Sequence, residues 1–194
     1  MKENELHWLI RAQDGDDQAF NELVSLYQNP VYNLCFRMLG NQGDAEDAAQ
    51  ETFWRAYQSI KKCDPDKKFA TWLLSIAAHH CIDLQRKRRL PQVEIEDWME
   101  ETIPESTPTP ESAFVTKLEQ ERIQKLLQKL PSQDRAVLIF KYWYQMSELE
   151  IAESLKITTS AVKSRLHRTR LKLAELYRQD STVMERMKHE SPAV

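Results

Sequence analysis

The sequence has little glycine, little cysteine and no long apolar run, and each shortage excludes a class of protein. Three glycines in 194 residues are too few for a fold built on strands and tight turns. The three cysteines are odd in number and stand within or beside helical patterns, which indicates reduced thiols rather than a disulfide framework. The chain also lacks an N-terminal signal core and any apolar run of the roughly 20 residues that span a membrane. We therefore expect an all-α, cytoplasmic protein.

Catalytic, metal and cofactor motifs are missing as well. His79, His80 and Cys81 resemble metal ligands, but three consecutive helical residues point in three directions and cannot share one ion. An enzyme acting on nucleic acid would need paired carboxylates or a His/Asp/Glu set in a cleft. The acidic residues instead fall on expected solvent faces or in a connector, and there is no glycine-rich phosphate loop. We expect no catalysis, no metal and no cofactor.

Charge is segregated along the chain, although the net charge is only −3. Residues 1–60 and 90–112 are acidic, whereas 61–89 and 113–194 are basic. Residues 90–112 hold seven acidic side chains, four prolines and no basic side chain, a composition typical of a self-repelling, partly extended connector. A single charged run is usually a solvated face, but two basic blocks favour two surfaces that meet a polyanion. We expect two small helical domains (1–89 and 113–180), an acidic, proline-containing linker (90–112) and a C-terminal tail (181–194).

Four helices are expected in the first domain, at about 16–27, 31–39, 44–60 and 69–88, with Pro30 between the first two. Asp44 is expected to cap the third helix. One face of that helix is apolar, and the opposite strip is acidic with an aromatic residue in its middle. A large aromatic side chain among carboxylates favours a protein-binding surface. This strip contains Asp47, Gln50, Glu51, Trp54 and Gln58.

The fourth expected helix combines aromatic residues with a basic end. His80 falls in its apolar stripe and is expected to be packed rather than reactive. Trp72 and His79 lie on a different strip, and the helix runs into Arg86 and Lys87. Aromatic and basic side chains together suit single-stranded nucleic acid, because bases stack on rings and phosphates need positive charge. The alternative, that Trp72 completes the core, stays open.

The second domain contains a helix-turn-helix pattern. After expected helices at about 113–129 and 132–144, Ser147 and Glu150 form a capping box that begins a helix ending near Leu155. Thr158 or Thr159 can cap the next helix. Two short helices joined by a turn of three or four residues are the helix-turn-helix motif.

The second helix of this motif has two different faces. An apolar stripe containing Val162, Leu166 and Thr169 is expected to pack inward. The outward face offers short polar groups and one long donor, bordered by arginines, which is typical of a helix that reads the DNA major groove. Its residues are Ser160, Lys163, Ser164 and His167, flanked by Arg165, Arg168 and Arg170.

Four segments occur in one order: GDAEDAAQETFWRAYQSI, KKFATWLLSIAAHHCIDLQRKRR, LPSQDRAVLIFKYWYQMSELEIAESLKI and TSAVKSRLHRTRLKL. With them the chain resembles the extracytoplasmic-function (ECF) sigma factors of bacteria, small two-domain relatives in the sigma-70 family, over about residues 16–178. The resemblance implies that the first domain binds core RNA polymerase and the minus-10 promoter element, and that the second binds the minus-35 element. It also implies a stress or envelope-response regulon and an anti-sigma factor, often membrane-anchored.

The resemblance further implies roles for individual residues. Asp47, Gln50, Glu51 and Trp54 would dock on the polymerase. Phe69, Trp72, His79 and Asp83 would open and hold the minus-10 element, beside the basic residues Arg86 and Lys87. Lys163, Ser164, Arg165, His167 and Arg168 would read the minus-35 element, beside Ser160 and Arg170.

Two residues depart from the family pattern. His79 stands where Asn is common, which leaves the minus-10 base preference open. Lys156 stands in the turn where Gly is frequent, and because a side chain at positive φ costs about 1 kcal/mol, a different turn geometry stays open.

The alternative function is a stand-alone helix-turn-helix repressor or activator, whose N-terminal domain would sense a signal or dimerise. Such a protein would bind duplex sites alone, as a dimer on a two-fold symmetric operator. A sigma factor would instead bind DNA weakly without polymerase, because two modules on a loose linker have no fixed spacing. The acidic linker and the strip around Trp54 favour the sigma factor.

Overall fold

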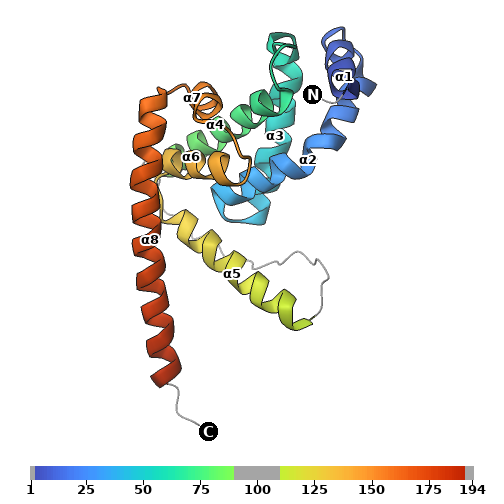
Figure 1. The fold of residues 1–194 in the computed structure, drawn as a ribbon. Coiled ribbons are helices and arrows are strands. Elements are labelled where there is room, and N and C mark those ends of the chain that lie inside the picture. The colour runs from blue at the N-terminus through green and yellow to red at the C-terminus, as the bar shows by residue number, and fades with distance from the viewer. Residues whose placement is uncertain (1–2, 90–109, 191–194) are drawn as a thin grey trace.

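A computed structural model describes residues 3–89 and 110–190, and all regular structure in these ranges is helical (Figure 1). The all-α prediction is confirmed. The first domain contains α1 (Glu3–Gln13), α2 (Asp17–Leu39), α3 (Gln42–Ser59), a short 3-10 helix (Ile60–Lys62) and α4 (Phe69–Arg89). The second contains α5 (Pro110–Gln128), α6 (Ser132–Tyr142), α7 (Glu148–Leu155) and α8 (Thr159–Glu190).

Two helices extend beyond their expected ends. The expected linker, 90–112, lies outside the described residues up to position 109, and α5 begins at Pro110, a position that suits proline because the first helical N–H has no intrahelical partner. Helix α8 continues to Glu190, through residues expected to form a tail. Helix α1 has no counterpart among the expected helices.

The expected helix break at Pro30 is wrong, because α2 runs through it without interruption. An interior proline removes one backbone hydrogen bond and costs about 3 kcal/mol. Val31, Leu34 and Cys35, which follow it, are completely buried, and the packing of this face offsets the cost. The proline predicted a helix break from the sequence, but tertiary packing keeps the helix continuous.

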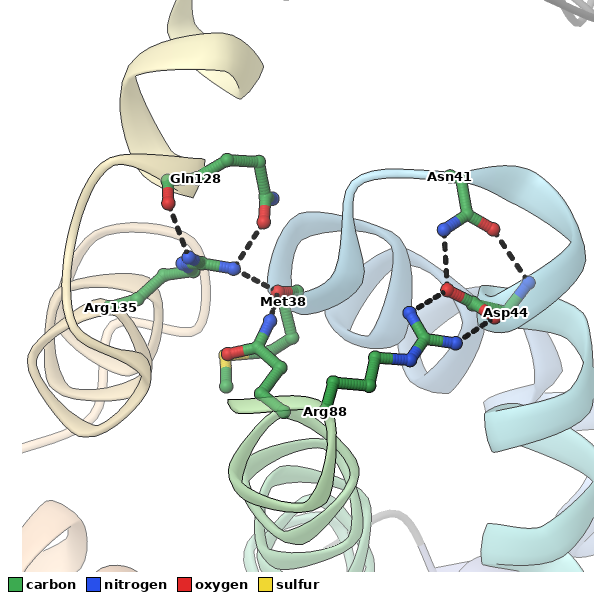
Figure 2. A network of polar contacts seen from close by, with 7 residues as sticks. Met38, Asn41, Asp44, Arg88, Gln128 and Arg135 are labelled. Carbon is green, nitrogen blue, oxygen red and sulfur yellow. Dashed lines mark hydrogen bonds and ion pairs between the residues drawn. The ribbon is translucent and has the colours of Figure 1, made fainter. Parts of the chain in front are cut away.

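The expected cap of α3 is also wrong, because Asn41 rather than Asp44 holds the first turn. The Asn41 side-chain oxygen accepts a hydrogen bond from the Asp44 backbone N–H at 2.8 Å. The Asp44 carboxylate instead receives both terminal guanidinium nitrogens of Arg88 from α4, one at 2.6 Å (Figure 2). This bidentate pair lowers the pKa of Asp44 and joins the start of α3 to the end of α4.

Helices α2, α3 and α4 pack against one another, and α1 lies on α2. The α3 surface in this core consists mainly of alanines, among them Ala45, Ala48 and Ala56, which are completely buried. Small side chains let the backbones approach closely, while Leu34 and Leu73 on α2 and α4 supply bulk. The core therefore fixes which face of α3 and of α4 remains outside.

In the second domain, α6 and α7 pack on α8, and α5 reaches α8 as well. The two domains also touch each other. Helix α4 contacts α6 and α7, while α2 contacts α5 and α6 (Figure 1). These contacts bring the helix-turn-helix beside the end of the first domain that carries the basic residues of α4.

Candidate nucleic-acid and protein interfaces

The acidic and aromatic strip of α3 lies on the surface. Asp47 and Gln50 are exposed, and the Trp54 side chain is 57% exposed. Glu51 is half-buried and accepts a hydrogen bond from Arg55 Nε at 2.6 Å, an interaction that lowers the pKa of Glu51. An exposed indole beside negatively charged groups is suited to a protein partner with basic and apolar side chains.

Tyr57 enlarges this aromatic surface and was not predicted. Its ring stacks beside that of Trp54, with centroids 6.4 Å apart and planes 20° apart. The Tyr57 hydroxyl donates to Asp17 Oδ1 at 2.7 Å, and the Tyr57 and Phe20 rings form a T-shaped pair with centroids 5.1 Å apart. The only sequence signal for Tyr57 was its spacing from Trp54, because residues three apart on a helix are neighbours.

The aromatic residues of α4 divide between core and surface. Phe69 is 1% exposed and packs against Tyr27 and Trp72, with centroids 5.4 Å and 5.6 Å away. Trp72 is half-buried against this support. In this structure Phe69 therefore belongs to the core, and the partly exposed edge of Trp72 is the aromatic group that α4 can offer.

His79 and His80 have different surroundings. The Nδ1 atom of His79 lies 2.8 Å from the Ser75 carbonyl oxygen, and because a carbonyl only accepts, this nitrogen carries the proton. His79 is half-buried. Its other ring nitrogen, Nε2, takes no part in this hydrogen bond. His80 is buried, as predicted, and burial lowers its pKa.

The basic end of α4 is exposed. Arg86 and Lys87 are both exposed, and Arg86 Nη2 lies 3.1 Å from Asp83 Oδ1. His79, Asp83 and Arg86 line one wall of a pocket. The other wall comes from the second domain: Gln133, Leu155, Ile157 and Arg165.

The predicted helix-turn-helix is present with its capping box. Ser147 Oγ accepts from the Glu150 N–H at 3.2 Å, and Glu150 Oε2 accepts from the Ser147 N–H at 2.8 Å. Lys156 adopts φ 54° and ψ 45°, the left-handed region usually taken by glycine. The Ile157 N–H reaches the Ala152 carbonyl at 3.0 Å, as in a glycine-ended helix. The turn thus keeps its usual geometry despite the lysine.

The two faces of the second helix of this motif are confirmed. Val162, Leu166 and Thr169 are buried. The outward residues Ser160, Lys163, Ser164, His167, Arg168 and Arg170 are exposed.

Arginines on this face are held by α6. Arg165 is half-buried, forms an ion pair with Asp134 and donates to Gln133 Oε1 at 2.8 Å. Arg170 Nε donates to the Tyr142 hydroxyl at 2.7 Å, and its guanidinium lies over the same ring. Tyr142, 52% exposed, was not predicted as a site residue. The sequence did not identify Tyr142, because only the fold places the end of α6 beside α8.

No described set of three or more His, Cys, Asp and Glu side chains is arranged to hold a metal ion. Among the described helices, none combines the length and apolar character needed to cross a membrane.

The sequence matches Sigma-70 region 2 over residues 23–90 and Sigma-70, region 4 over residues 120–173. It is 39% identical over 168 residues to the ECF RNA polymerase sigma factor SigW of Bacillus subtilis (strain 168), covering 82% of this chain and 89% of SigW. The chain belongs to the ECF sigma factors of the sigma-70 family. As a sigma factor it binds RNA polymerase and promoter DNA to initiate transcription.

Solved structures of sigma factors share this fold. CnrH in complex with the cytosolic domain of CnrY matches with a TM-score of 0.69 at 26% identity, over 92% of this chain and 99% of that one. The sigma factor RpoE in complex with the anti-sigma factor NepR from Bartonella quintana matches with a TM-score of 0.64, over 82% of this chain and 96% of that one. At 20% identity, the second likeness is one of fold.

Proposed function

We propose that this sigma factor docks on the polymerase through α3, opens and holds the minus-10 element with α4, and reads the minus-35 element with α8. One observation carries the proposal: three chemically different faces stand on three helices of one folded chain. The α3 face is acidic and aromatic, the α4 face aromatic and basic, and the α8 face polar and basic.

The polymerase-binding residues in this proposal are Asp47, Gln50, Glu51 and Trp54, extended by Tyr57. Trp54 is the anchor, because a large exposed aromatic side chain contributes most when a partner buries it. The carboxylates around it select a basic partner surface and steer its approach.

For the minus-10 element, the proposal assigns Trp72 as the group on which an unpaired base stacks. Phe69 supports Trp72 from the core, while His79 and Asp83 offer hydrogen-bonding groups to base edges. Arg86 and Lys87 meet the phosphates of the displaced strand. Chemistry in transcription is supplied by the polymerase in this scheme, so the sigma factor contributes binding and strand opening rather than catalysis.

For the minus-35 element, Lys163 donates to guanine O6 or N7 in the major groove. Ser160, Ser164 and His167 are short enough to let the helix approach the base edges. Arg168 and Arg170 contact phosphates. Arg165 pairs with Asp134 and so positions α8 on α6. It contacts the DNA only at the edge of the α8 binding face.

The proposed domain boundaries follow the same division: 1–89, the acidic linker 90–112, 113–180, and a tail at 181–194. The matched family regions, 23–90 and 120–173, support it because they leave the acidic segment between them. We further propose action in the cytoplasm, where the polymerase acts, on a stress or envelope-response regulon. An anti-sigma factor, membrane-anchored in this proposal, would control it, by analogy with CnrH, which was solved in complex with the cytosolic domain of CnrY.

Run-off transcription tests the proposal. Purified bacterial core polymerase is supplied with a pool of promoter fragments, with and without this protein. We expect discrete start sites only when the protein is present, and the transcribed fragments then give its promoter elements. Binding to duplex DNA alone, without core binding or initiation, would contradict the proposed role of the first domain.

A further inference from the structure

The basic side chains on the outward face of α8 differ in what holds them. Most are paired with carboxylates: Lys163 with Glu148, and Arg165 and Arg168 with Asp134. Arg170 instead donates from Nε to the Tyr142 hydroxyl at 2.7 Å. Among the residues whose side chains the structure describes, no carboxylate pairs with Arg170. Its guanidinium is therefore held in place without being neutralised.

An uncharged partner suits an arginine that has to meet a phosphate. A carboxylate would cancel the positive charge on which binding to the DNA backbone depends. The Tyr142 ring also lies against the Arg170 guanidinium, with the ring centroid 5.7 Å from Cζ. A long side chain that is already ordered loses less conformational entropy when it binds. Tyr142 thus prepares Arg170 for an anion.

The hydrogen bond between these two residues leaves donors for a further acceptor. It uses only Nε of Arg170, so the N–H groups on Nη1 and Nη2 can serve another group. The Tyr142 oxygen accepts in this contact, and its own proton can be donated elsewhere. Tyr142 is 52% exposed, and Arg170 is exposed as well. Two helices therefore present donors side by side to the solvent.

Both residues are attached to buried parts of their helices. Tyr142 is the last residue of α6, and residues 135–140 before it are buried. The Trp143 N–H, which follows, donates to the Ile139 carbonyl at 2.9 Å. On α8, Thr169 beside Arg170 is 2% exposed. Because α6 and α8 pack directly on each other, the core of the domain sets the geometry of the pair.

The pair lies at the far end of the face that is proposed to read bases. Arg170 follows Lys163 by seven residues, which is about 10 Å along a helix and only about 20° around it. The major groove is about 12 Å wide. When Lys163 reaches a base edge inside the groove, Arg170 therefore comes to the border of the groove, where the phosphates lie. Tyr142 stands beside it.

We propose that Tyr142 and Arg170 form a phosphate clamp, in which Arg170 Nη and the Tyr142 hydroxyl donate to one phosphate at the border of the minus-35 major groove. Tyr142 both contacts the DNA and positions Arg170. The proposal rests on the proposed binding of α8 to the minus-35 element, and it adds an α6 residue to that site. A backbone phosphate fits because its charged oxygens can accept from two neighbouring donors.

The test uses holoenzyme assembled from this protein and core polymerase, with a promoter found by run-off transcription. Each phosphate of the minus-35 element is replaced singly by a methylphosphonate, which has no charge and nearly the same shape. Competition against the labelled unmodified fragment gives the affinity lost at each position. For the wild type, we expect a loss of at least about fivefold at the clamped phosphate.

Two variants identify that phosphate. Arg170→Ala is expected to weaken binding to unmodified DNA and to reduce the loss at one position to less than about twofold, because the partner of that phosphate is already gone. Tyr142→Phe keeps the ring and removes only the hydroxyl. It is expected to weaken binding several-fold and to reduce the loss at the same position. In both variants, the other positions should keep their wild-type losses.

The matched controls are Tyr177→Phe and Arg178→Ala, which make related changes farther along α8. They should leave the loss at every position as in the wild type. Unchanged affinity for core polymerase shows that each variant is folded.

A purely structural role of Tyr142 would lower the affinity for all fragments by one factor and leave the pattern of losses unaltered, and that result would overturn the clamp. The clamp is also overturned if no position responds to Arg170→Ala. If Lys163→Ala still changes minus-35 discrimination in that case, only the clamp has failed. If neither variant has an effect, the assignment of α8 to the minus-35 element has failed as well. Run-off transcription judges the sigma-factor role independently.

Discussion

At the residue scale, Lys156 shows how a single backbone conformation can outweigh side-chain preference. It occupies the left-handed region, where a Cβ atom contacts neighbouring backbone and glycine is favoured. The helix-turn-helix needs that conformation because the Ile157 N–H must return to the Ala152 carbonyl. The strain is local, so its removal should alter stability without altering the motif.

Lys156→Gly is therefore expected to raise the free energy of unfolding by about 0.5–1 kcal/mol, the strain relieved minus the entropy lost by glycine. Urea denaturation followed by circular dichroism measures it. Lys156→Ala is the control, because it removes the charge and keeps the Cβ atom. Equal stabilities of the two variants would show that strain at this residue is not the cause.

Trp54→Ala is expected to weaken core polymerase binding at least tenfold, roughly the effect of removing an aromatic anchor from an interface. The fold should be unchanged, because the side chain is 57% exposed. Leu26→Ala, which removes another exposed apolar side chain, on α2, is the matched control. A titration of labelled protein with core polymerase in which both variants bind like the wild type would remove the α3 strip from the docking surface.

At the scale of the element, the first turn of the short helix α7 both caps the helix and contacts the first domain. Eight residues are too few for a helix to be stable alone, and the capping box satisfies its first N–H groups. Its Glu150 also pairs with Lys68 of α4. The Lys68 ammonium, together with the Ser147 donors, lowers the pKa of Glu150 from its ordinary value of 4.5 to about 2.

This shift predicts a pH dependence of stability. A lowered folded-state pKa means that the Glu150 contribution is complete above about pH 4.5 and is lost as the pH falls toward about 2. At neutral pH, Glu150→Gln is expected to lower the free energy of unfolding by about 1 kcal/mol, since Lys68 is largely exposed to solvent and screened. The gap between variant and wild type should close in acid denaturation series. A constant gap would mean that the carboxylate charge contributes nothing.

Helix α8 gives a prediction on specificity. Lys163 is exposed, and its ion pair with Glu148 is loose, since Glu148 Oε2 lies 3.6 Å from Lys163 Nζ. Replacing this pair by a contact with DNA therefore costs little free energy. Lys163→Ala is expected to reduce minus-35 discrimination by roughly 1–3 kcal/mol, measured by run-off competition between matched and mutated promoters. Lys172→Ala, a control on the same helix, should leave discrimination intact. Unchanged promoter selection by the Lys163 variant would place the reading helix elsewhere.

At the scale of the whole molecule, one continuous apolar cluster extends through both domains, and directional polar groups add to it at the end of α2. Arg135 is a buried polar member of this contact, 2% exposed, and serves both domains, since it donates to Met38, Gln128 and Leu130 at once. A planar guanidinium can address several carbonyl groups in fixed directions, whereas an ammonium cannot. The packing of the two domains against each other therefore depends on the geometry of the guanidinium group and not on its charge alone.

Arg135→Lys is expected to lower the free energy of unfolding by about 2 kcal/mol, because buried carbonyl groups lose their donors. Chemical denaturation measures the loss. The exposed pair of α3 supplies a control, since Arg55→Lys should change stability by less than about 0.5 kcal/mol. Similar small effects for both variants would argue that the buried arginine contributes no more than a surface one.

The spacing of residues along single helices made much of the fold predictable from the sequence. The capping box at Ser147, the inward stripe of Val162 and Leu166, and the burial of His80 all follow from spacing on a helix, because 3.6 residues per turn dictates which side chains share a face. The same periodicity defined the strips of α3 and α8. Helix α1 was missed because its short apolar pattern gains meaning only when it packs on α2.

The sequence by itself determined that the chain is helical, where its helix-turn-helix lies and which faces carry charge, because these depend on neighbours along one helix. Tertiary structure decided the rest. It kept α2 continuous through Pro30, moved Asp44 from a cap to a partner of Arg88, and buried Phe69 beneath Trp72. It also brought Glu150 to Lys68 across 82 positions of the chain. Contacts between residues so far apart depend on how whole helices pack, which no local spacing encodes.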